Sequence, residues 1–598
     1  MIIMQILRSY VEPVLGNALS KIGIKDDSWK SMLTPSREHS QGDLSLPCFP
    51  FAKILGKNPV AIAEEIASSI EKTTEIGEIS SAAGYLNFKA NPKWLVSELL
   101  SNKIRIGDAF GGKPCTGRKV LIEHTSANPN GPFHVGRARN AILGDTLVRL
   151  HRLLGNEVRA EYYVDDMGKQ VAVLAWALEN LSENQIKEIL RDSNEISPKW
   201  KNKADHTRVR WYQAAQKLRQ DETESAQIEL DIAKLVHDSE NGNHKVLEKF
   251  NNAFHPVLEG MLTTLKRLGI EFDEFTKESM FVTNGDVEKL MKALSELDIH
   301  GVADNGAEYL DLGSRGLKGK TEFYFKRGDG SSLYATRDIA YHIWKWSQCD
   351  ELINVLGEDH KLQARQVGLT LKELGHKVPE VLFYSFIKLP EGKMSTRKGN
   401  VVFMDDLLEE AKEHAEQIVR QLRNEYNEDQ VSEIAEAVGS SAIRFNIIKV
   451  SPDKGFTFRW EEALAFEAGS APFIMYSSTR ARSIAKRCAE LGLDVELICQ
   501  KGILFDDITD ELPDSLIDLL RCMAIQNDVL LRSVEQSRPN LFANQILNLA
   551  TCFNGFYRDC KIIESGEVNE MYLQISQLAS GFLKSGMEGL GITPLERM

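Results

Sequence analysis

The stretch SANPNGPFHVGRARNAILGD, residues 126–145, separates two different patterns of apolar residues. Before it, KVLIEHTSA (119–127) is a run of apolar residues typical of a buried strand. After it, apolar residues recur near helical spacing as far as Gly155, a good helix stop. EVRAEYYVDDMG (157–168) then begins as a second strand. Strand, loop, helix and strand in this order predict the opening of a parallel, Rossmann-like sheet.

The loop between this strand and this helix is suited to binding a phosphate. In parallel sheets, ligands bind beyond the carboxyl ends of strands, and a helix N-terminus offers free N–H groups with partial positive charge. His134 can donate a hydrogen bond to phosphate, and Gly136 lets a flat base approach the backbone. Arg137 and Arg139 add fixed positive charge. Taken alone, the loop is equally compatible with a surface turn that caps a helix.

A second stretch, LPEGKMSTRKGNVVF (389–403), follows another predicted strand and concentrates positive charge. Its cations are Lys393, Arg397 and Lys398, and glycines flank them on both sides. Such charge suits a transferring phosphoryl or adenylyl group, on which negative charge develops. A basic loop alone is usually a solvated surface feature, but paired with the first loop it predicts nucleotide chemistry.

Length and composition set the class of protein. With 598 residues, the chain is expected to fold as two to four domains. Its 42% hydrophobic and 26% charged residues are those of a soluble globular protein, and we find neither a membrane-span pattern nor a signal peptide. The eight cysteines form no CxxC pair, so we expect a reducing cytoplasm and no metal site. The net charge of −14 argues against indiscriminate nucleic-acid binding but allows a local basic face.

The pattern predicts an α/β protein of three domains. Residues 1–115 form a small α+β domain, 116–465 the parallel-sheet domain, and 466–598 an almost all-helical domain. A charged helical insertion covers about 170–300. Further strands are predicted at TEFYF (321–325), ELINVLG (351–357) and VLFYSFIKL (381–389).

Longer motifs identify the family that the sequence resembles. HVGR (134–137) is similar to the HIGH signature, and KMSTR (393–397) to the KMSKS signature, of class I aminoacyl-tRNA synthetases. The chain also carries, in order, IEHTSANPNGPFHVGRARN, YYVDDMGKQ, GDGSSLYATRDIAYH, EGKMSTRKGN, FNGFYRDC and LGITPLERM. Together these resemble arginyl-tRNA synthetases, the archaeal type more than others, from about residue 40 to the end.

The resemblance implies both a fold and a reaction. The fold is a Rossmann catalytic domain, followed by a helical anticodon-binding domain and preceded by a domain that contacts the tRNA D-loop. In the reaction, the carboxylate of arginine attacks the α-phosphate of ATP to give arginyl-adenylate, and the arginyl group then passes to the 3′ end of tRNA(Arg). Mg²⁺ accompanies ATP, and no permanently bound cofactor is implied. The first step needs bound tRNA, and we expect a cytoplasmic monomer with no membrane partner.

The resemblance also implies an arginine pocket. A guanidinium is recognised by carboxylates in its plane and by an aromatic or hydroxyl partner. Tyr334 and Asp338 lie four residues apart in LYATRDIAY and so share a helix face. Without the family, Asp338 would be interpreted as a surface carboxylate beside Arg337. The implied arginine-binding set is Glu123, Ser126, Asn128, His134, Tyr334 and Asp338.

The catalytic and nucleotide-binding sets come from the two signature loops. The implied catalytic set is His134, Gly136, Arg137, Lys393, Ser395, Arg397 and Lys398. The implied ATP-binding set is Pro132, His134, Gly136, Asn140, Gly357, His360, Lys393, Met394 and Ser395. His360 stands where the family often has glutamine, so a structural role is equally open. Arg137 replaces the second histidine of HIGH but keeps a positive charge that can bind phosphate bidentately, so we expect activity at a reduced rate.

Two regions face tRNA by resemblance: AGYLNF (83–88) and APFIMYSSTRARSIAKR (471–487). In the first, an aromatic ring stacks on a D-loop base and an asparagine reads a base edge, as single-stranded RNA is usually recognised. The second is a basic run that contacts phosphates beside the anticodon. Spacing alone would instead indicate a strand with a core aromatic residue and a solvated helix face. The implied contacts are Tyr85, Asn87, Tyr476, Arg480 and Arg482.

Three other functions are open on the sequence. A relative that charges another amino acid is disfavoured by the Tyr334 and Asp338 pair. A degenerate paralogue that only binds tRNA or a partner is favoured by Arg137 alone, against an intact basic loop. A small-molecule nucleotidyltransferase on the same fold would not explain the helical C-terminal domain.

Overall fold

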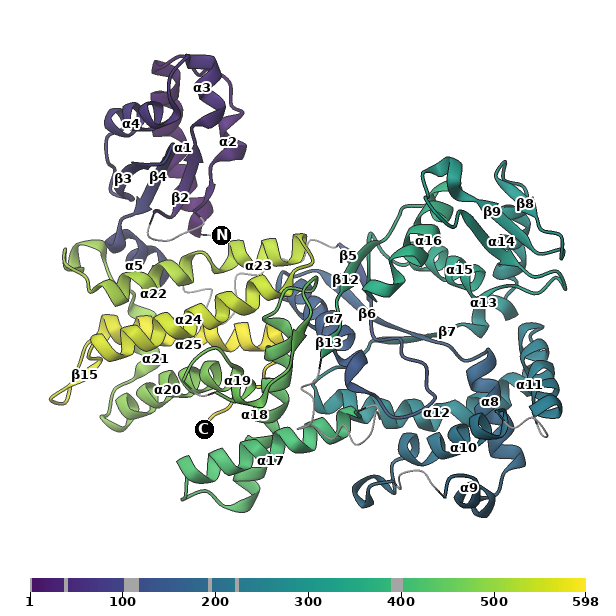
Figure 1. Ribbon diagram of the computed structural model, residues 1–598. Helices are drawn as coiled ribbons and strands as arrows, with labels where there is room; N and C mark the ends of the chain where they lie inside the picture. The colour runs from purple at the N-terminus through teal and green to yellow at the C-terminus, as the bar shows by residue number, and fades with distance from the viewer. Residues whose placement is uncertain are drawn as a thin grey trace. The chain divides into compact units, whose positions relative to one another are not determined.

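The fold is described from a computed structural model, which covers residues 3–36, 41–101, 118–191, 196–220, 225–388, 402–465 and 467–598. The chain divides into two compact units (Figure 1). The first contains Met1–Cys115, Leu153–Gly155 and Glu461–Met598, and the second contains Thr116–Arg152 and Asn156–Trp460.

The second unit is built on a five-stranded parallel sheet in the order β12-β11-β5-β6-β7. The strands are β5 (Lys119–Glu123), β6 (Glu157–Val164), β7 (Glu274–Lys277), β11 (Glu351–Gly357) and β12 (Glu380–Tyr384). The chain runs from β5 through β6 to β7 and then returns to β11 on the other side of β5. The prediction of a parallel, Rossmann-like sheet is therefore confirmed, with the switch point between β5 and β11.

Helix α7 (Val135–Leu153) covers the sheet, as the apolar spacing of the opening stretch predicts. Leu143 and Leu147 of this helix pack against Val120 and Ile122 of β5 in one buried cluster. The cluster fixes the N-terminus of α7 at the carboxyl end of β5, where the predicted site lies.

A helical insertion separates β6 from β7, and its helices α8, α10 and α12 lie together (Figure 1). Its elements are α8 (Lys169–Asn180), α9 (Glu183–Ile189), η1 (Pro198–Trp200), α10 (Ala204–Leu218), α11 (Ser225–Glu240) and α12 (His244–Arg267). The predicted insertion extended to about residue 300, but its last helix ends at Arg267. The chain then returns to the central sheet as its edge strand, β7 (Glu274–Lys277).

The remainder of the second unit adds a small antiparallel sheet and further helices. The predicted strand at 321–325 belongs to that small sheet, of order β10-β9-β8, and the stretch 381–389 divides between β12 and β13. The elements are α13 (Ser279–Thr283), α14 (Asp286–Ser295), β8 (His300–Val302), β9 (Glu308–Asp311), η2 (Leu312–Arg315), β10 (Glu322–Lys326), α15 (Tyr334–Trp346), η3 (Glu358–His360), α16 (Lys361–Glu373), β13 (Ile387–Lys388), α17 (Met404–Leu422), α18 (Glu428–Ile448), β14 (Phe456–Thr457) and α19 (Trp460–Ala463), the last at the unit boundary.

The first unit combines an N-terminal α+β part with a C-terminal bundle of helices. Its antiparallel sheet has the order β1-β2-β4-β3. The N-terminal elements are α1 (Ile3–Lys21), α2 (Trp29–Met32), β1 (Thr34–Pro35), β2 (Leu44–Pro47), α3 (Phe49–Leu55), α4 (Pro59–Ser69), β3 (Ile76–Ala82), β4 (Tyr85–Ala90) and α5 (Pro92–Ser101). The C-terminal elements are α20 (Ala471–Glu490), α21 (Val495–Lys501), η4 (Phe505–Asp507), α22 (Asp514–Ala524), α23 (Gln526–Glu535), α24 (Pro539–Asp559), β15 (Ile563–Glu564), β16 (Glu567–Val568) and α25 (Glu570–Leu590).

Ion pairs join the two parts of the first unit. Lys93 of α5 lies 2.9 Å from Asp510, and Arg521 of α22 lies 3.4 Å from the buried Asp43. Every cysteine in the described part of the chain is a free thiol, whereas Cys115 lies outside it. No helix among the described residues has the length and apolar character needed to cross a bilayer.

Candidate functional site

The turn after β5 places two residues in a strained conformation. Thr125 and Ser126 have φ of 69° and 36°, in the left-handed region that side chains normally avoid. Asn140 of α7 holds this turn, because its Oδ1 accepts from Thr125 N at 2.6 Å and its Nδ2 donates to the Val355 carbonyl at 2.8 Å. Asn140, expected to bind ATP, therefore bridges β5 and β11 across the switch point of the sheet.

The HVGR segment is paired with the chain just before α17. Val135 N donates to the Val402 carbonyl at 3.0 Å, Met404 N donates to the Phe133 carbonyl at 2.7 Å, and His134 forms a β-bridge with Phe403. The His134 ring lies so close to Gly136 that a Cβ there would be 3.1 Å from Nδ1. A side chain at position 136 would therefore crowd the imidazole.

His134 is held as a neutral imidazole. Burial, and then the neighbouring Arg137 charge, lower the pKa of His134 to about 4. A neutral ring has one N–H to donate and carries no charge. Arg137 is half-buried at the start of α7 and supplies the positive charge of this segment.

Arg139 does not face a ligand, contrary to the prediction that it adds charge to the loop. Its side chain is fully buried, donates to the Ser385 carbonyl and, at 2.9 Å, to the Ser451 carbonyl, and lies 5.4 Å from the Phe456 ring centre. Because the guanidinium satisfies these inner carbonyls, its role is to fix α7 against the segments that contain Ser385 and Ser451.

Four polar side chains connect the end of β5 to α15. Lys345, which is fully buried, donates from Nζ to Glu123 Oε2 at 2.6 Å. The same Nζ lies 3.3 Å from His342 Nε2, and His342 Nδ1 lies 3.1 Å from Asp338 Oδ1. We call Glu123, Lys345, His342 and Asp338 the carboxylate chain, because it joins two carboxylates of the predicted arginine pocket through two buried side chains.

The donors in this chain fix the tautomer of His342. Lysine only donates, and Asn354 Oδ1 accepts from Lys345 at 3.0 Å, so the Asn354 amide donates to His342 Nε2 at 2.8 Å. Nε2 is therefore an acceptor, and the ring proton resides on Nδ1, which lies 2.7 Å from the Asp338 backbone carbonyl and 3.1 Å from Asp338 Oδ1. Burial alone would raise the pKa of Asp338, but its charge interaction and hydrogen bond with His342 lower that pKa. Asp338 is thus an ionised, oriented acceptor with 16% of its side chain exposed, not a surface carboxylate.

Two tyrosines lie beside the carboxylate chain. Tyr334, at the first turn of α15, is 45% exposed and can cover a ligand. The Tyr163 hydroxyl is buried and has no hydrogen-bond partner among the described residues. Burial, followed by the nearby Glu278, Tyr334 and Asp338, raises the pKa of Tyr163 well above its usual value. A buried hydroxyl without a protein partner is suited to contact a polar ligand.

A second carboxyl pair, Glu278 and Asp165, lies in the same region beside Arg337. Glu278, fully buried, accepts from the Arg337 guanidinium. It also shares a hydrogen bond with Asp165, and burial raises the pKa of Asp165 to about 6 although this hydrogen bond lowers it. Arg337 thus pairs with Glu278 and not with Asp338, its neighbour in sequence.

The other residues of the predicted arginine-binding set lie on the same loop. Ser126 Oγ donates to Glu123 Oε1 at 3.1 Å and accepts from Tyr163 N at 3.1 Å. Asn128 Nδ2 donates to Gln170 Oε1 at 3.0 Å, at the start of α8. The structure therefore brings Glu123, Ser126 and Asp338 together through these hydrogen bonds and ion pairs, and places Asn128 at the border with the insertion.

The predicted ATP-binding residues are spread along the switch point. Pro132 is buried in the loop, and Gly357 ends β11, where a Cβ would lie only 2.4 Å from Asp359 Oδ1. His360 is exposed at the start of α16, with Nδ1 3.4 Å from Gln363 Oε1. The predicted residues Lys393, Met394, Ser395, Arg397 and Lys398 lie outside the described residues.

The two residues of the predicted D-loop motif lie two positions apart on β4 and differ in exposure. Tyr85 is 40% exposed and meets Phe49 edge to face, with ring centres 5.4 Å apart. Asn87 is buried, and its Oδ1 accepts from Ser45 Oγ inside the sheet. The expected contact of Asn87 with a base edge stays a prediction, and in this structure the side chain is buried against Ser45 of β2.

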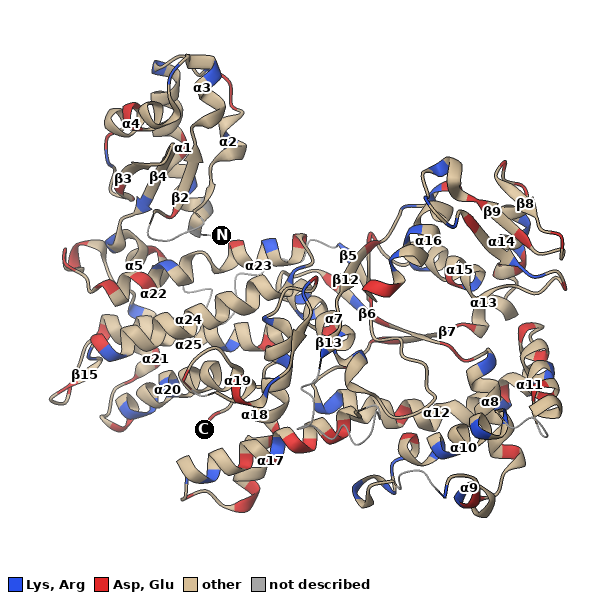
Figure 2. Cartoon of the chain, in the orientation of Figure 1, with Lys and Arg blue, Asp and Glu red and all other residues tan. Residues whose placement is uncertain are grey.

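The basic run on α20 is partly structural (Figure 2). Arg480 lies between the rings of Tyr476 and Tyr557, 4.8 Å from each ring centre, and donates to Asn554. Arg482 instead holds the C-terminal tail through the Leu595 carbonyl at 3.0 Å and Glu596 at 2.7 Å.

Comparison with known proteins completes the description of the site. The chain matches the tRNA synthetases class I (R) catalytic domain over residues 96–460, the DALR anticodon binding domain over 474–598 and the arginyl tRNA synthetase N-terminal domain over 9–90. It is 39% identical over 566 residues to the arginine–tRNA ligase of Methanocella arvoryzae, covering 94% of each chain. It is 36% identical to that of Methanocaldococcus jannaschii, covering 99% of this chain and 100% of the relative. The solved arginyl-tRNA synthetase of Thermus thermophilus superposes with a TM-score of 0.75 at 25% identity, covering 99% of this chain and 100% of that one.

Proposed function

The chain belongs to the arginyl-tRNA synthetase family, which uses ATP to join arginine to tRNA(Arg), and from this premise we propose how its residues divide the reaction. The arginine side chain binds between Tyr334 and the carboxylate chain. Asp338 accepts hydrogen bonds from the guanidinium, and the Tyr334 ring covers the face of the guanidinium. The Tyr163 hydroxyl also contacts the guanidinium. This assignment is supported by the series of contacts between side chains that runs from Glu123 through the buried Lys345 and His342 to Asp338.

The same arrangement gives selectivity for arginine. His342 donates to Asp338 from one side, so the free lone pairs of this ionised carboxylate lie in a fixed plane. A planar guanidinium matches that plane with two parallel donors, whereas an ammonium is a compact point charge. Glu123, whose Oε2 is occupied by Lys345 and whose Oε1 accepts from Ser126, sets the depth of the pocket and holds the arginine amino group.

In the activation step, a carboxylate oxygen of arginine attacks the α-phosphorus of ATP, and the bond to the bridging oxygen of the leaving pyrophosphate breaks. ATP enters as its Mg²⁺ complex. Neutral His134 donates its single N–H to the α-phosphate, and the N-terminus of α7 faces the same group. Arg137 stabilises the negative charge that moves onto pyrophosphate. From the sequence we assign Lys393, Ser395, Arg397 and Lys398 to the same leaving group.

Recognition of tRNA uses the first unit. Tyr85 stacks on a D-loop base, supported by Phe49, while Asn87 stiffens the strand behind it. Arg480 and Tyr476 form an aromatic and cationic surface for the anticodon loop. The working division is 1–115 for the D-loop, 116–465 for catalysis and 466–598 for the anticodon. The enzyme acts as a cytoplasmic monomer in protein synthesis.

Aminoacylation with matched amino acids tests the pocket. Arginine should be charged onto tRNA(Arg), whereas lysine, a point charge, and citrulline, an uncharged isostere, should both fail at the same concentration. Charging of citrulline at a rate near that of arginine would refute the role of an ionised Asp338.

A further inference from the structure

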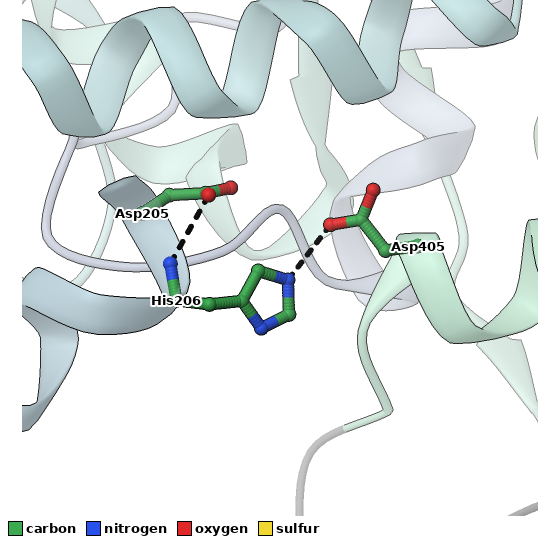
Figure 3. A group of neighbouring side chains, drawn as sticks. All are labelled: Asp205, His206 and Asp405. Atoms are coloured by element: carbon green, nitrogen blue, oxygen red, sulfur yellow. Dashed lines mark hydrogen bonds and ion pairs between the residues drawn. The ribbon is translucent and has the colours of Figure 1, made fainter. Parts of the chain in front are cut away.

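A buried polar cluster connects the helical insertion to the chain that leads into α17. Lys203, at the N-terminus of α10, lies with Nζ 2.9 Å from Asp205 Oδ2 and 2.7 Å from Asp405 Oδ2. His206 Nε2 lies 2.8 Å from the same Asp405 oxygen (Figure 3). Thr264 of α12 accepts from Lys203 at 2.6 Å and donates to Asp405 Oδ1 at 2.9 Å. Asp405 is therefore held by three side chains of the insertion.

Two carboxylates and an imidazole at this distance resemble a metal site, but the cluster contains its own cation. The ligand atoms of Asp205, His206 and Asp405 lie within 4.8 Å of one another. The Lys203 ammonium lies within hydrogen-bond distance of both carboxylates and so supplies the positive charge that a metal would bring. Gly260 of α12 makes room for this arrangement, because a Cβ there would lie 2.5 Å from Asp205 Oδ1.

Asp405 is ionised and almost fully buried. Only 1% of its side chain is exposed, against 5% for His206 and 17% for Lys203. Burial alone would raise the pKa of Asp405, but the hydrogen bond with His206 and the charge of Lys203 lower it. The contact between Asp405 and the insertion is thus an ion pair shielded from solvent, where electrostatic interactions are strong.

The anchored residue directly follows the segment that pairs with the HVGR loop. Val402 and Met404 are hydrogen-bonded to Val135 and Phe133, on either side of His134. The His206 ring also meets Phe403, the bridge partner of His134, with ring centres 5.3 Å apart. A displacement of Asp405 would therefore move Met404 and Phe403, the backbone residues that pair with the HVGR segment and position His134.

We propose that Lys203, His206 and Asp405 form a positioning cluster through which the helical insertion sets the place of His134 in arginine activation. The inference rests on the role of His134 proposed above. Removing the Lys203 charge leaves two buried carboxylates facing each other, so Asp405 must shift away from Asp205. A shift of about 1 Å in a catalytic group lowers a rate by roughly 100-fold. The arginine pocket is attached to β5 and α15 by other contacts and is not affected.

The test compares Lys203→Met with Lys199→Met. Lys199 also joins the insertion to α17, 2.9 Å from Glu413, but its side chain is 53% exposed. The assay is arginine-dependent ATP–pyrophosphate exchange with tRNA, with active sites counted from the burst of AMP. We expect Lys203→Met to lower kcat about 100-fold, with the KM for arginine within about twofold of the wild-type value. Lys199→Met should retain the wild-type kcat, and Lys203→Arg should recover part of the loss.

A double-mutant cycle with His134→Ala separates positioning from general damage. If Lys203 acts through His134, the double variant should be no slower than His134→Ala alone. Multiplied losses, or a wild-type kcat in Lys203→Met, would overturn the inference while leaving the role of His134 intact. A wild-type kcat in His134→Ala alone would refute that role and the inference with it.

Asp405→Asn provides a second variant in case Lys203→Met fails to fold. The amide keeps the size of the side chain and can still accept from Thr264. We expect the same loss of kcat and the same absence of additivity with His134→Ala. A folded Asp405→Asn protein with a wild-type kcat would contradict the proposal.

Discussion

Replacing Asp338 by asparagine tests the arginine pocket without disturbing its framework. The asparagine Oδ1 can still accept from His342 Nδ1, so α15 and the carboxylate chain should remain in place. The substitution removes the negative charge that faces the guanidinium and replaces one acceptor oxygen with an N–H₂ donor. The perturbation is therefore confined to the contact with substrate.

The size of the effect follows from the kind of hydrogen bond that is lost. A hydrogen bond to a charged group contributes about 1.5–3 kcal/mol. At about 1.4 kcal/mol per factor of ten, kcat/KM for arginine should fall by roughly 10- to 150-fold. The KM for ATP should stay within about twofold, because the proposed ATP site is formed by the HVGR loop and β11 and not by Asp338.

Steady-state pyrophosphate exchange with varied arginine and then varied ATP measures both quantities. Asp298→Asn is the matched control, since Asp298 pairs with Arg315 at the surface with 74% of its side chain exposed. An unchanged kcat/KM for arginine in Asp338→Asn, or an equal rise in the KM for ATP, would refute the assignment of Asp338 to the guanidinium.

Four further predictions follow from the same contacts. Lys345→Met leaves Glu123 without its buried partner, so the free energy of unfolding, measured by urea denaturation, should fall by about 3–5 kcal/mol. A wild-type urea midpoint would contradict the carboxylate chain. Arg137→His should leave the rate of arginine activation unchanged or raise it. A large loss of pyrophosphate exchange would show that the Arg137 side chain has a role that histidine cannot fill. The pKa of His134 is about 4 in the folded protein and about 6.5 in the unfolded chain. The unfolded chain therefore binds more protons between these two values, so the contribution of His134 makes the free energy of unfolding fall as the pH falls through that window. The kcat of activation should show no inflection near pH 6.5, and an inflection there that His134→Ala removes would refute a neutral imidazole. Tyr85→Ala should raise the Kd for tRNA(Arg) by roughly 5- to 150-fold, from a stacking contribution of about 1–3 kcal/mol, and Tyr85→Phe should restore binding; equal Kd values for all three proteins would exclude stacking.

The central sheet was predictable because most of its strands have an unambiguous pattern. Buried parallel strands are continuous apolar runs, and Val120, Leu121 and Ile122 of β5 are all buried. The strand β7 lacks such a pattern, since only Thr276 of its residues is buried. Nothing in its sequence distinguishes it from a loop between helices, so the predicted insertion ran through it.

The family motifs predicted the residues of the proposed arginine pocket, but not the buried side chains that connect them. Asp338, His342 and Lys345 lie four and three residues apart on α15, one face of the helix. A polar stripe at that spacing normally indicates a solvated face, so the buried Lys345 and His342 were not predicted. Their partner Glu123 is distant in sequence, and only the pairing of β11 with β5 brings it near. Tyr163 was missed for the same reason, although it lies within a motif that the sequence shares with the family.

Local sequence also gave the wrong environment for two polar residues. Arg139 and Asn87 were expected to face ligands, yet both are buried, with 0% and 1% of their surface exposed. Arg139 satisfies carbonyls from two segments far away in sequence, and Asn87 lies between Leu86 and Phe88, which are also buried. Alternation along β4 places Asn87 on the same face as Tyr85, but Asn87 lies opposite Ser45 of β2, accepts from its hydroxyl and is buried there.

ATP–pyrophosphate exchange by the intact chain, with and without tRNA(Arg), tests the central claim most directly. The claim is that the pocket at the carboxyl end of β5 selects and activates arginine. We predict exchange that requires both arginine and tRNA(Arg), is absent with lysine or citrulline, and is lowered selectively by Asp338→Asn. Equal exchange with lysine, or no exchange with any amino acid from folded protein that binds ATP, would contradict it.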